Sequence, residues 1–269
     1  MSELQRLVDV RADGDSWIGA ASGPAGKRAF GGQFAAQALA AAWRTVDADR
    51  LPTNMQLQYL RGGDAGEETT YTVTPMFDGR TASARRVDAH HGSRLLNTST
   101  VSFALPMRGP EHGRRDPGAQ DPEALPQTGP PGPAPALPLE ELDIRIVDEG
   151  TGERFVRHMW WRASVPLPDD PVLHTLIAVC VCDLYMTDAP LRVHGHSMAA
   201  RTHRSGTTNW SMWFHQPVRA DEWNLLETMS PAASRGRGVV TGSLIRADGV
   251  VAATHAQEGF IAEREPTAG

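Results

Sequence analysis

Proline is distributed unevenly along this chain of 269 residues. Ten of its twenty prolines lie between Pro106 and Pro138. Proline lacks the N–H that a sheet ladder needs and it blocks helix interiors, so no packed element is expected in this segment. The chain is therefore predicted to form two modules, residues 1–105 and 139–269, joined by a proline-rich linker over residues 106–138. A spacer is the commoner role of such a segment, ahead of docking to a partner domain.

The composition argues against several classes of protein. The 26 basic and 32 acidic residues give a net charge of −6, whereas a dedicated nucleic-acid binder needs a basic surface. Two cysteines, Cys180 and Cys182, are too few for a disulfide framework and suit a reducing compartment. No apolar run approaches the ~18 residues of a membrane span, and the N-terminus lacks a signal-peptide layout. We expect a cytoplasmic protein with no nucleic-acid or membrane partner.

Each flank of the linker contains one stretch that predicts a buried helix. Residues 34–43 are apolar nearly all round and rich in alanine, the best helix former. In the second flank, Asp170 can cap a helix that begins at Pro171 and runs through apolar residues to Cys182. Helices without a polar face need cover on most sides, so both are expected to lie in the interior.

Strand signals follow each predicted helix. Residues 55–59 alternate between apolar and polar side chains, a period of two. Residues 69–77 are rich in strand formers and end at Asp78-Gly79, a hairpin signal. The same criteria predict further strands at residues 81–89, 93–105, 207–215, 223–229, 238–246 and 250–261.

The two flanks share this layout. Placing residues 221–259 on residues 65–103 aligns strand with strand, although few residues are identical, which indicates a duplicated module. An antiparallel sheet curled round each helix would cover its apolar surface. Two such modules joined edge to edge would form one continuous sheet. Its exposed edges favour a homodimer or a larger homo-oligomer.

Asp183 is the most informative candidate for chemistry. It directly follows the apolar run that ends at Cys182, where a carboxylate is costly unless it is hydrogen-bonded or paired. Buried acids are over-represented at working sites, but a helix-end residue that faces solvent fits the same pattern. Taken singly, Thr207 also fits an ordinary strand residue, and Gln257 fits a plain edge strand.

The sequence gives no support for a metal or a cofactor. His194, His196 and His203 lie near one another, but their spacing matches no known type of zinc site. Cys180 and Cys182 are too close for a redox or zinc pair, and buried cysteines acting as small apolar residues explain them better. Neither a G-x-S-x-G nucleophile elbow nor a phosphate-binding loop is present.

Several motifs, taken in order, resemble the type II acyl-CoA thioesterases. They cover nearly the whole chain outside the linker, and their combined order and spacing are specific. The motifs are Phe30-Gly31-Gly32-Gln33, Tyr59-Leu60-Arg61, Asp78-Gly79-Arg80, Trp160-Trp161-Arg162-Ala163, Cys182-Asp183-Leu184, Ser211-Met212-Trp213-Phe214-His215 and Gln257-Glu258-Gly259.

The resemblance implies an α+β double hotdog fold, in which each of two modules wraps an antiparallel sheet round a long helix. It also implies hydrolysis of fatty acyl-CoA to a free acid and CoA. By position in the motifs, the family's catalytic aspartate, hydroxyl and glutamine match Asp183, Thr207 and Gln257. Under the overlay Gln257 falls on Val101, so the first module is expected to lack the set and the chain to have one site.

In the site implied by this resemblance, Asp183, Thr207 and Gln257 hold a water, and Asp183 either takes its proton or only orients it. Backbone N–H groups around Gly32 and Gln33 are candidate donors to the substrate carbonyl. Trp210, where the family commonly has histidine, is expected to line the acyl channel. Burial would raise the pKa of Asp183 and hydrogen bonds would lower it.

Three alternatives stay open at this stage. An enoyl-CoA hydratase on the same fold needs a placed Asp and His, and no Asp-x-x-x-x-His unit follows Asp183. A hotdog protein that binds acyl-CoA or an acyl carrier without cleaving it would not need Asp183, Thr207 and Gln257 together. A scaffolding protein would act through the proline-rich segment.

Overall fold

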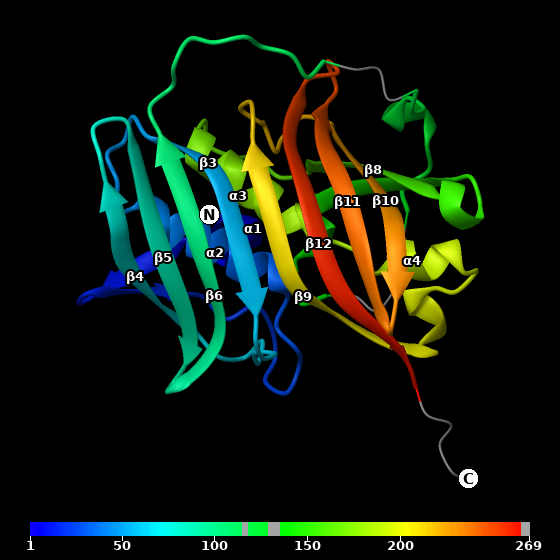
Figure 1. Ribbon diagram of the computed structural model, residues 1–269, viewed down its shortest axis with the longest axis horizontal. Helices are drawn as coiled ribbons and strands as arrows, with labels where there is room; N and C mark the ends of the chain where they lie inside the picture. Colours follow the sequence, from blue (N-terminus) through cyan, green and yellow to red (C-terminus); the bar gives the residue numbers. More distant parts are fainter. Residues whose placement is uncertain (115–117, 129–134, 265–269) are drawn as a thin grey trace.

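The strands of this chain form a single sheet. The computed structural model describes residues 1–114, 118–128 and 135–264. Within these residues the sheet has twelve strands in the order β1-β2-β4-β5-β6-β3-β9-β12-β11-β10-β8-β7, each pair antiparallel (Figure 1). The strands are β1 (Val10–Asp13), β2 (Ser16–Gly19), β3 (Leu51–Tyr59), β4 (Thr69–Asp78), β5 (Ala82–His91), β6 (Arg94–Ala104), β7 (Leu142–Glu149), β8 (Val156–Ala163), β9 (His203–Phe214), β10 (Asn224–Ser234), β11 (Arg237–Arg246) and β12 (Val251–Glu263).

The two halves of the chain meet at β3 and β9. Leu57 pairs with Trp210 across this junction. Two side chains strengthen it, because Asn54 donates to the Met212 carbonyl and Gln58 donates to the Thr208 carbonyl, both at 3.0 Å. The predicted edge-to-edge joining of two sheets is confirmed.

The helices lie together on one face of the sheet (Figure 1). The two long helices, α2 and α3, contact each other, and α2 also contacts β4 and β5. None of the helices in the described ranges is long and apolar enough to cross a membrane. The helices are α1 (Glu3–Val8), α2 (Gly31–Trp43), α3 (Pro171–Cys182) and α4 (Asp188–Val193), with 3-10 turns η1 (Pro122–Ala124), η2 (Leu139–Glu141), η3 (Gly152–Arg154) and η4 (Met198–Ala200).

Both long helices form where the sequence predicts them. The Asp170 carboxylate caps α3 by accepting from the Val172 N–H at 2.9 Å, and Pro171 occupies the first turn. In α2 nearly every residue is buried, as its lack of a polar face requires. Glycine lets the two helices approach, because a Cβ at Gly32 would lie 2.3 Å from the Cys180 carbonyl oxygen.

Four strands near the edges of the sheet escape the sequence analysis. β1 and β2 are only four residues long, too short to show a period. β8 is buried at almost every position, so its side chains do not alternate between apolar and polar. β7 does alternate, with Leu142, Ile144 and Ile146 apolar and Asp143 and Arg145 polar, so this strand could have been predicted from the sequence.

The described part of residues 106–138 packs against the second half of the chain. Glu123 accepts from the Trp223 indole N–H at 2.9 Å, and the Pro122 carbonyl accepts from Arg145 at 2.6 Å. Leu137 is buried in the main core. The expectation that no packed element lies here is therefore wrong for these residues. The most proline-rich stretch, residues 129–134, lies outside the described residues.

Candidate active site

Asp183 lies where the end of α3 meets the start of α2. It is the residue that ends α3, and only 8% of it is exposed. The N–H of Gly32, in the first turn of α2, donates to its carboxylate. A Cβ at Gly31 would lie 2.7 Å from Asp183 Oδ2, so the carboxylate reaches this helix end only because glycine is there. The N-terminus of a helix favours a negative charge.

Thr207 and Gln257 reach Asp183 from two neighbouring strands. Gln257, on β12, donates through Nε2 to Asp183 Oδ1 at 2.8 Å and also to Thr207 Oγ1, on β9. Thr208 is turned elsewhere, because its hydroxyl donates to Glu258 Oε2 at 2.7 Å. The pairing of β9 with β12 shifts register here, and Thr208 borders the same cavity although its hydroxyl is engaged by Glu258. The structure thus brings together the three predicted catalytic residues.

Burial dominates the acidity of Asp183. Removal from water raises the pKa of its carboxyl from 3.8 to about 6. Hydrogen bonds from Gln257, the Gly32 N–H and Thr207 lower it, as does the charge of Arg28, but these effects are smaller in sum. A carboxylate that titrates near pH 6 is ionised at neutral pH and basic enough to accept a proton from water.

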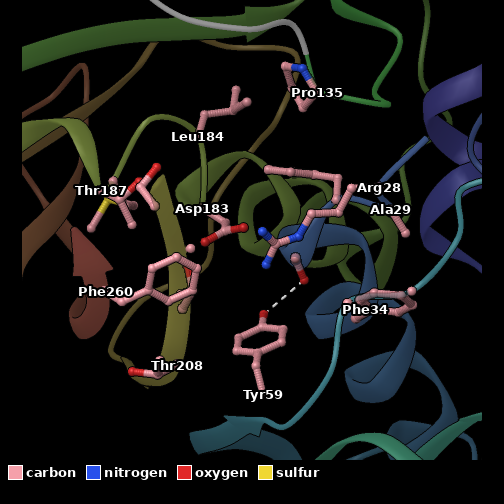
Figure 2. Close-up of a pocket in the computed structure, with 18 of the residues that line it drawn as sticks. Arg28, Ala29, Phe34, Tyr59, Pro135, Asp183, Leu184, Thr187, Thr208 and Phe260 are labelled. Carbon is pink, nitrogen blue, oxygen red and sulfur yellow. Dashed lines mark hydrogen bonds between the residues drawn. The ribbon is translucent and has the colours of Figure 1, made fainter. Parts of the chain in front are cut away.

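A cavity of about 400 Å³ opens in front of Asp183 and Thr207. Figure 2 shows Asp183 facing this space, with Tyr59 and Phe260 on one side and Leu184 on another. Gln257 is not among the lining residues and lies behind the other two. Among the lining residues, the apolar or aromatic side chains are Ala29, Phe30, Phe34, Tyr59, Leu60, Pro135, Leu184, Tyr185, Met186, Met198 and Phe260.

The other predicted binding residues lie beside the cavity. Gly32 contacts Asp183, and its N–H is engaged by that carboxylate. The Gln33 amide donates to the Ala20 carbonyl at 2.6 Å, and its side chain is buried. Trp210 is buried next to the His255 ring, with 6.2 Å between ring centroids. Gln33 and Trp210 are not among the residues that line the cavity, so their role in substrate binding stays a prediction.

Tyr59 and Arg28 line the cavity without having been predicted as site residues. The Tyr59 hydroxyl donates to the Gly31 carbonyl at 2.9 Å and so holds the turn that leads into α2. Burial, followed by the charge of Asp183, raises the pKa of Tyr59. Tyr59 belongs to the family motif Tyr59-Leu60-Arg61, and this motif is the sequence signal that could have identified it as a site residue. Arg28 stands in a loop and resembles any surface arginine in the sequence.

The first module lacks an equivalent set of side chains. Gln257 pairs with Trp210 and Val240, and Val101 pairs with Met55 and Arg85. Trp210 lies as many residues after Met55 as Val240 lies after Arg85. The strand partners of Gln257 in the second module therefore correspond to those of Val101 in the first, and Val101 holds the position of Gln257. In the same way Thr207 pairs with Gly259, and Pro52 pairs with Phe103. Valine and proline have no side-chain group that can donate to a carboxylate.

Side chains that bind metals do not gather in the described residues. No group of three or more His, Cys, Asp or Glu there is arranged to hold a metal ion. The His196 and His203 rings lie 4.8 Å apart and are tilted against each other. Cys180 and Cys182 are free thiols, and burial raises the pKa of both.

Two family models match this chain, one in each half. The model described as acyl-CoA thioesterase N-terminal domain matches residues 20–104, and the C-terminal domain of the same family matches residues 115–261. The chain belongs to the acyl-CoA thioesterase family. The resemblance inferred from the motifs is thereby confirmed. Human acyl-coenzyme A thioesterase 8 is 31% identical over 263 residues, which cover 87% of this chain and 81% of the human protein.

Solved structures agree with this assignment. Acyl-CoA thioesterase II TesB2 from Mycobacterium marinum has a TM-score of 0.82 and 28% identity, and the match covers 99% of this chain and all of that one. A conserved protein with a hot dog fold from Alicyclobacillus acidocaldarius has a TM-score of 0.76 and 20% identity, over 99% of this chain and all of that one. The acyl-CoA thioesterase described here therefore has the predicted hotdog fold.

Proposed function

We propose that Asp183, Thr207 and Gln257 form the catalytic group of a fatty acyl-CoA hydrolase. The proposal rests on one observation: Gln257 is hydrogen-bonded to both Asp183 and Thr207 next to a largely apolar cavity. Asp183 and Thr207 border the cavity and contact the attacking water. Asp183 takes the proton of this water as general base. Gln257 fixes the orientation of both from behind, so it is a positioning residue.

The acyl chain occupies the apolar part of the cavity. Each buried CH₂ contributes roughly 0.8 kcal/mol, so the size of the apolar lining sets a preference for chain length. Phe34, Leu184 and Phe260 are among the lining residues that an acyl chain would contact. Trp210 and Gln33 stay proposed substrate-binding residues although they do not line the cavity, and the Gly32 N–H donates to the carboxylate.

The first module serves as a wall of the site. Pro52 and Val101 stand at the register positions of Thr207 and Gln257, which supports one catalytic site in each chain. Tyr59, Arg28 and Gly31 come from the first module and border the same cavity. The module division at residues 105 and 138 therefore places Asp183, Thr207 and Gln257 in the second half, while the first half completes the cavity.

Hydrolysis is favoured over the alternatives by the composition of the cavity. A hotdog hydratase needs a histidine beside its acid, and none is among the residues that line this cavity. A protein that only binds acyl-CoA has no need of a carboxylate whose pKa lies near 6, buried with two polar partners. We further infer a cytoplasmic homo-oligomer, supported by the two free cysteines and by edge strands β1 and β7.

Release of CoA thiol tests the function. The purified enzyme is incubated with a panel of acyl-CoA lengths, and the free thiol is followed spectroscopically. Wild type is expected to release thiol, and Asp183→Asn to lose at least ~100-fold in kcat. Asp15→Asn, in the exposed turn between β1 and β2, is the matched control. Full turnover by Asp183→Asn would remove Asp183 from the mechanism, and hydration of crotonyl-CoA without thiol release would favour a hydratase.

A further inference from the structure

One cation in the cavity has no role in the scheme above. Arg28 lines the cavity together with Asp183 and Thr207. Its guanidinium has no hydrogen bond or ion pair with any residue that the structure describes. In contrast, Arg61, which lines the same cavity, donates to the Leu95 carbonyl at 2.9 Å. Figure 2 shows the Arg28 side chain extending across the cavity toward Asp183.

The backbone around Arg28 determines where its guanidinium ends. Arg28 forms a β-bridge with Asp64, and the next N–H, of Ala29, donates to the Gly63 carbonyl at 3.0 Å. A Cβ at Gly206 would lie 2.9 Å from Arg28 Nη2. The guanidinium therefore sits against a glycine that directly precedes Thr207. Any side chain at residue 206 would collide with the guanidinium in this position.

We infer that the Arg28 guanidinium binds the thioester carbonyl oxygen and stabilises the negative charge that develops there during hydrolysis. This inference rests on the proposed function. The water on Asp183 and Thr207 must lie about 3 Å from the carbonyl carbon, so the carbonyl oxygen falls among the groups that surround these two residues. Of the two arginines that line the cavity, Arg28 is the one whose guanidinium has no hydrogen bond to any described residue, and its charge acts on Asp183. Preorganised donors aimed at such an oxygen are a large source of rate enhancement.

Two other assignments fit the geometry less well. The Gly32 N–H at the start of α2 donates to Asp183, so it is not free for the substrate oxygen. The phosphates of CoA are separated from the sulfur by the extended pantetheine arm. A guanidinium that adjoins Gly206 and faces Asp183 is therefore at the thioester end of the substrate and out of reach of the phosphates.

The reaction balances with these groups. The water oxygen bonds to the carbonyl carbon, its proton passes to Asp183, and the carbonyl π electrons move to the oxygen that faces Arg28. The C–S bond then breaks as the carbonyl re-forms. The proton on Asp183 passes to the departing thiolate, which gives a free acid and the CoA thiol. Arg28 gives and takes no proton in either step.

Variants of Arg28 assayed on two substrates test the inference. Arg28→Gln and Arg28→Lys are compared on an acyl-CoA and on the N-acetylcysteamine thioester of the same acid, which lacks the phosphates. Arg28→Gln is expected to lower kcat roughly 10- to 100-fold on both, with KM changed less than about 3-fold, and Arg28→Lys to lose less. Arg11→Gln is the control, because Arg11 pairs with Glu68 on the surface of β1.

Each other outcome overturns the inference. A loss confined to acyl-CoA and seen in KM would assign Arg28 to the CoA phosphates. A loss that disappears at high pH would mean that Arg28 only keeps Asp183 ionised, and unchanged kinetics would leave Arg28 without a role. In all three cases wild type would still release thiol and Asp183→Asn would not, so the proposed function would stand.

Discussion

Gln257 donates through its amide nitrogen to Asp183 Oδ1 at 2.8 Å, although 74 residues separate them in the chain. The same nitrogen donates to Thr207, so one amide group fixes both residues that face the cavity. Gln257 is only 2% exposed, which shields these bonds from competing water. The site is therefore preorganised by a residue that lies behind it.

The pH dependence of hydrolysis should follow Asp183. Burial raises the pKa of its carboxyl to about 6, and only the ionised form accepts a proton from water. We expect kcat/KM to be level above pH 7 and to fall about tenfold per pH unit well below pH 6. A pH–rate profile on a single acyl-CoA measures this. A profile that stays flat down to pH 4 would show that Asp183 is not the base.

Removing the charge of Asp183 should stabilise the fold while it abolishes activity. Because the folded pKa is raised above its unfolded value, the carboxyl favours folding at low pH and loses that contribution as pH rises through about 6. The shift corresponds to about 3 kcal/mol by linkage. Asp183→Asn should thus raise the unfolding temperature at pH 8, and the gain should shrink toward pH 4. Thermal unfolding at both pH values checks this, and a variant less stable at pH 8 would contradict it.

Replacing Gln257 tests its positioning role. Gln257→Ala should lower kcat more than it raises KM, because the substrate does not contact this amide. Gln257→Glu should move the acidic limb of the pH–rate profile to higher pH, since a second carboxylate beside Asp183 raises the pKa of the pair. An unshifted profile in Gln257→Glu would argue that the two groups do not interact.

Gly32 should tolerate no side chain. A Cβ there would lie 2.3 Å from the Cys180 carbonyl oxygen and 2.9 Å from Asp183 Cβ, so α2 and α3 would have to separate. Gly32→Ala is expected to cost about 1–3 kcal/mol of stability and to lose most of the activity. Gly109→Ala is the control, because a Cβ at Gly109 meets nothing within 4 Å. Equal urea midpoints for the two variants would refute the close approach of the helices.

His158 should make stability depend on pH at the far end of the sheet. Its ring lies between Glu227 and Glu149, each at 3.2 Å, and the hydrogen bond to Glu227 is the largest of the effects that raise its pKa above 6.5. This contribution is complete below pH 6.5 and is lost as pH rises through the folded pKa. His158→Gln should therefore lose more stability against wild type at about pH 5.5 than at about pH 8.5. Urea midpoints at the two pH values measure the difference, and a constant gap would exclude the effect.

Local patterns predicted most of the elements correctly. The run to Cys182, the cap at Asp170 and the alternation in residues 55–59 each depend on neighbours within a few positions, so they are visible in one dimension. The edge strands β1 and β2 and the fully buried β8 carry no such period. The turn at Pro122 was excluded because proline was expected to prevent packing, yet its carbonyl still accepts from Arg145.

The sequence by itself determined the two buried helices, most of the strands and the family, and it singled out Asp183, Thr207 and Gln257 as the candidate residues, because each is encoded in short motifs or periods. Only the tertiary structure decided that Asp183 is buried with a pKa near 6, that Gln257 stands behind it and that Arg28 enters its cavity. These properties depend on how strands and helices distant in the chain approach each other. Burial and electrostatic effects are set by that approach and by no local pattern.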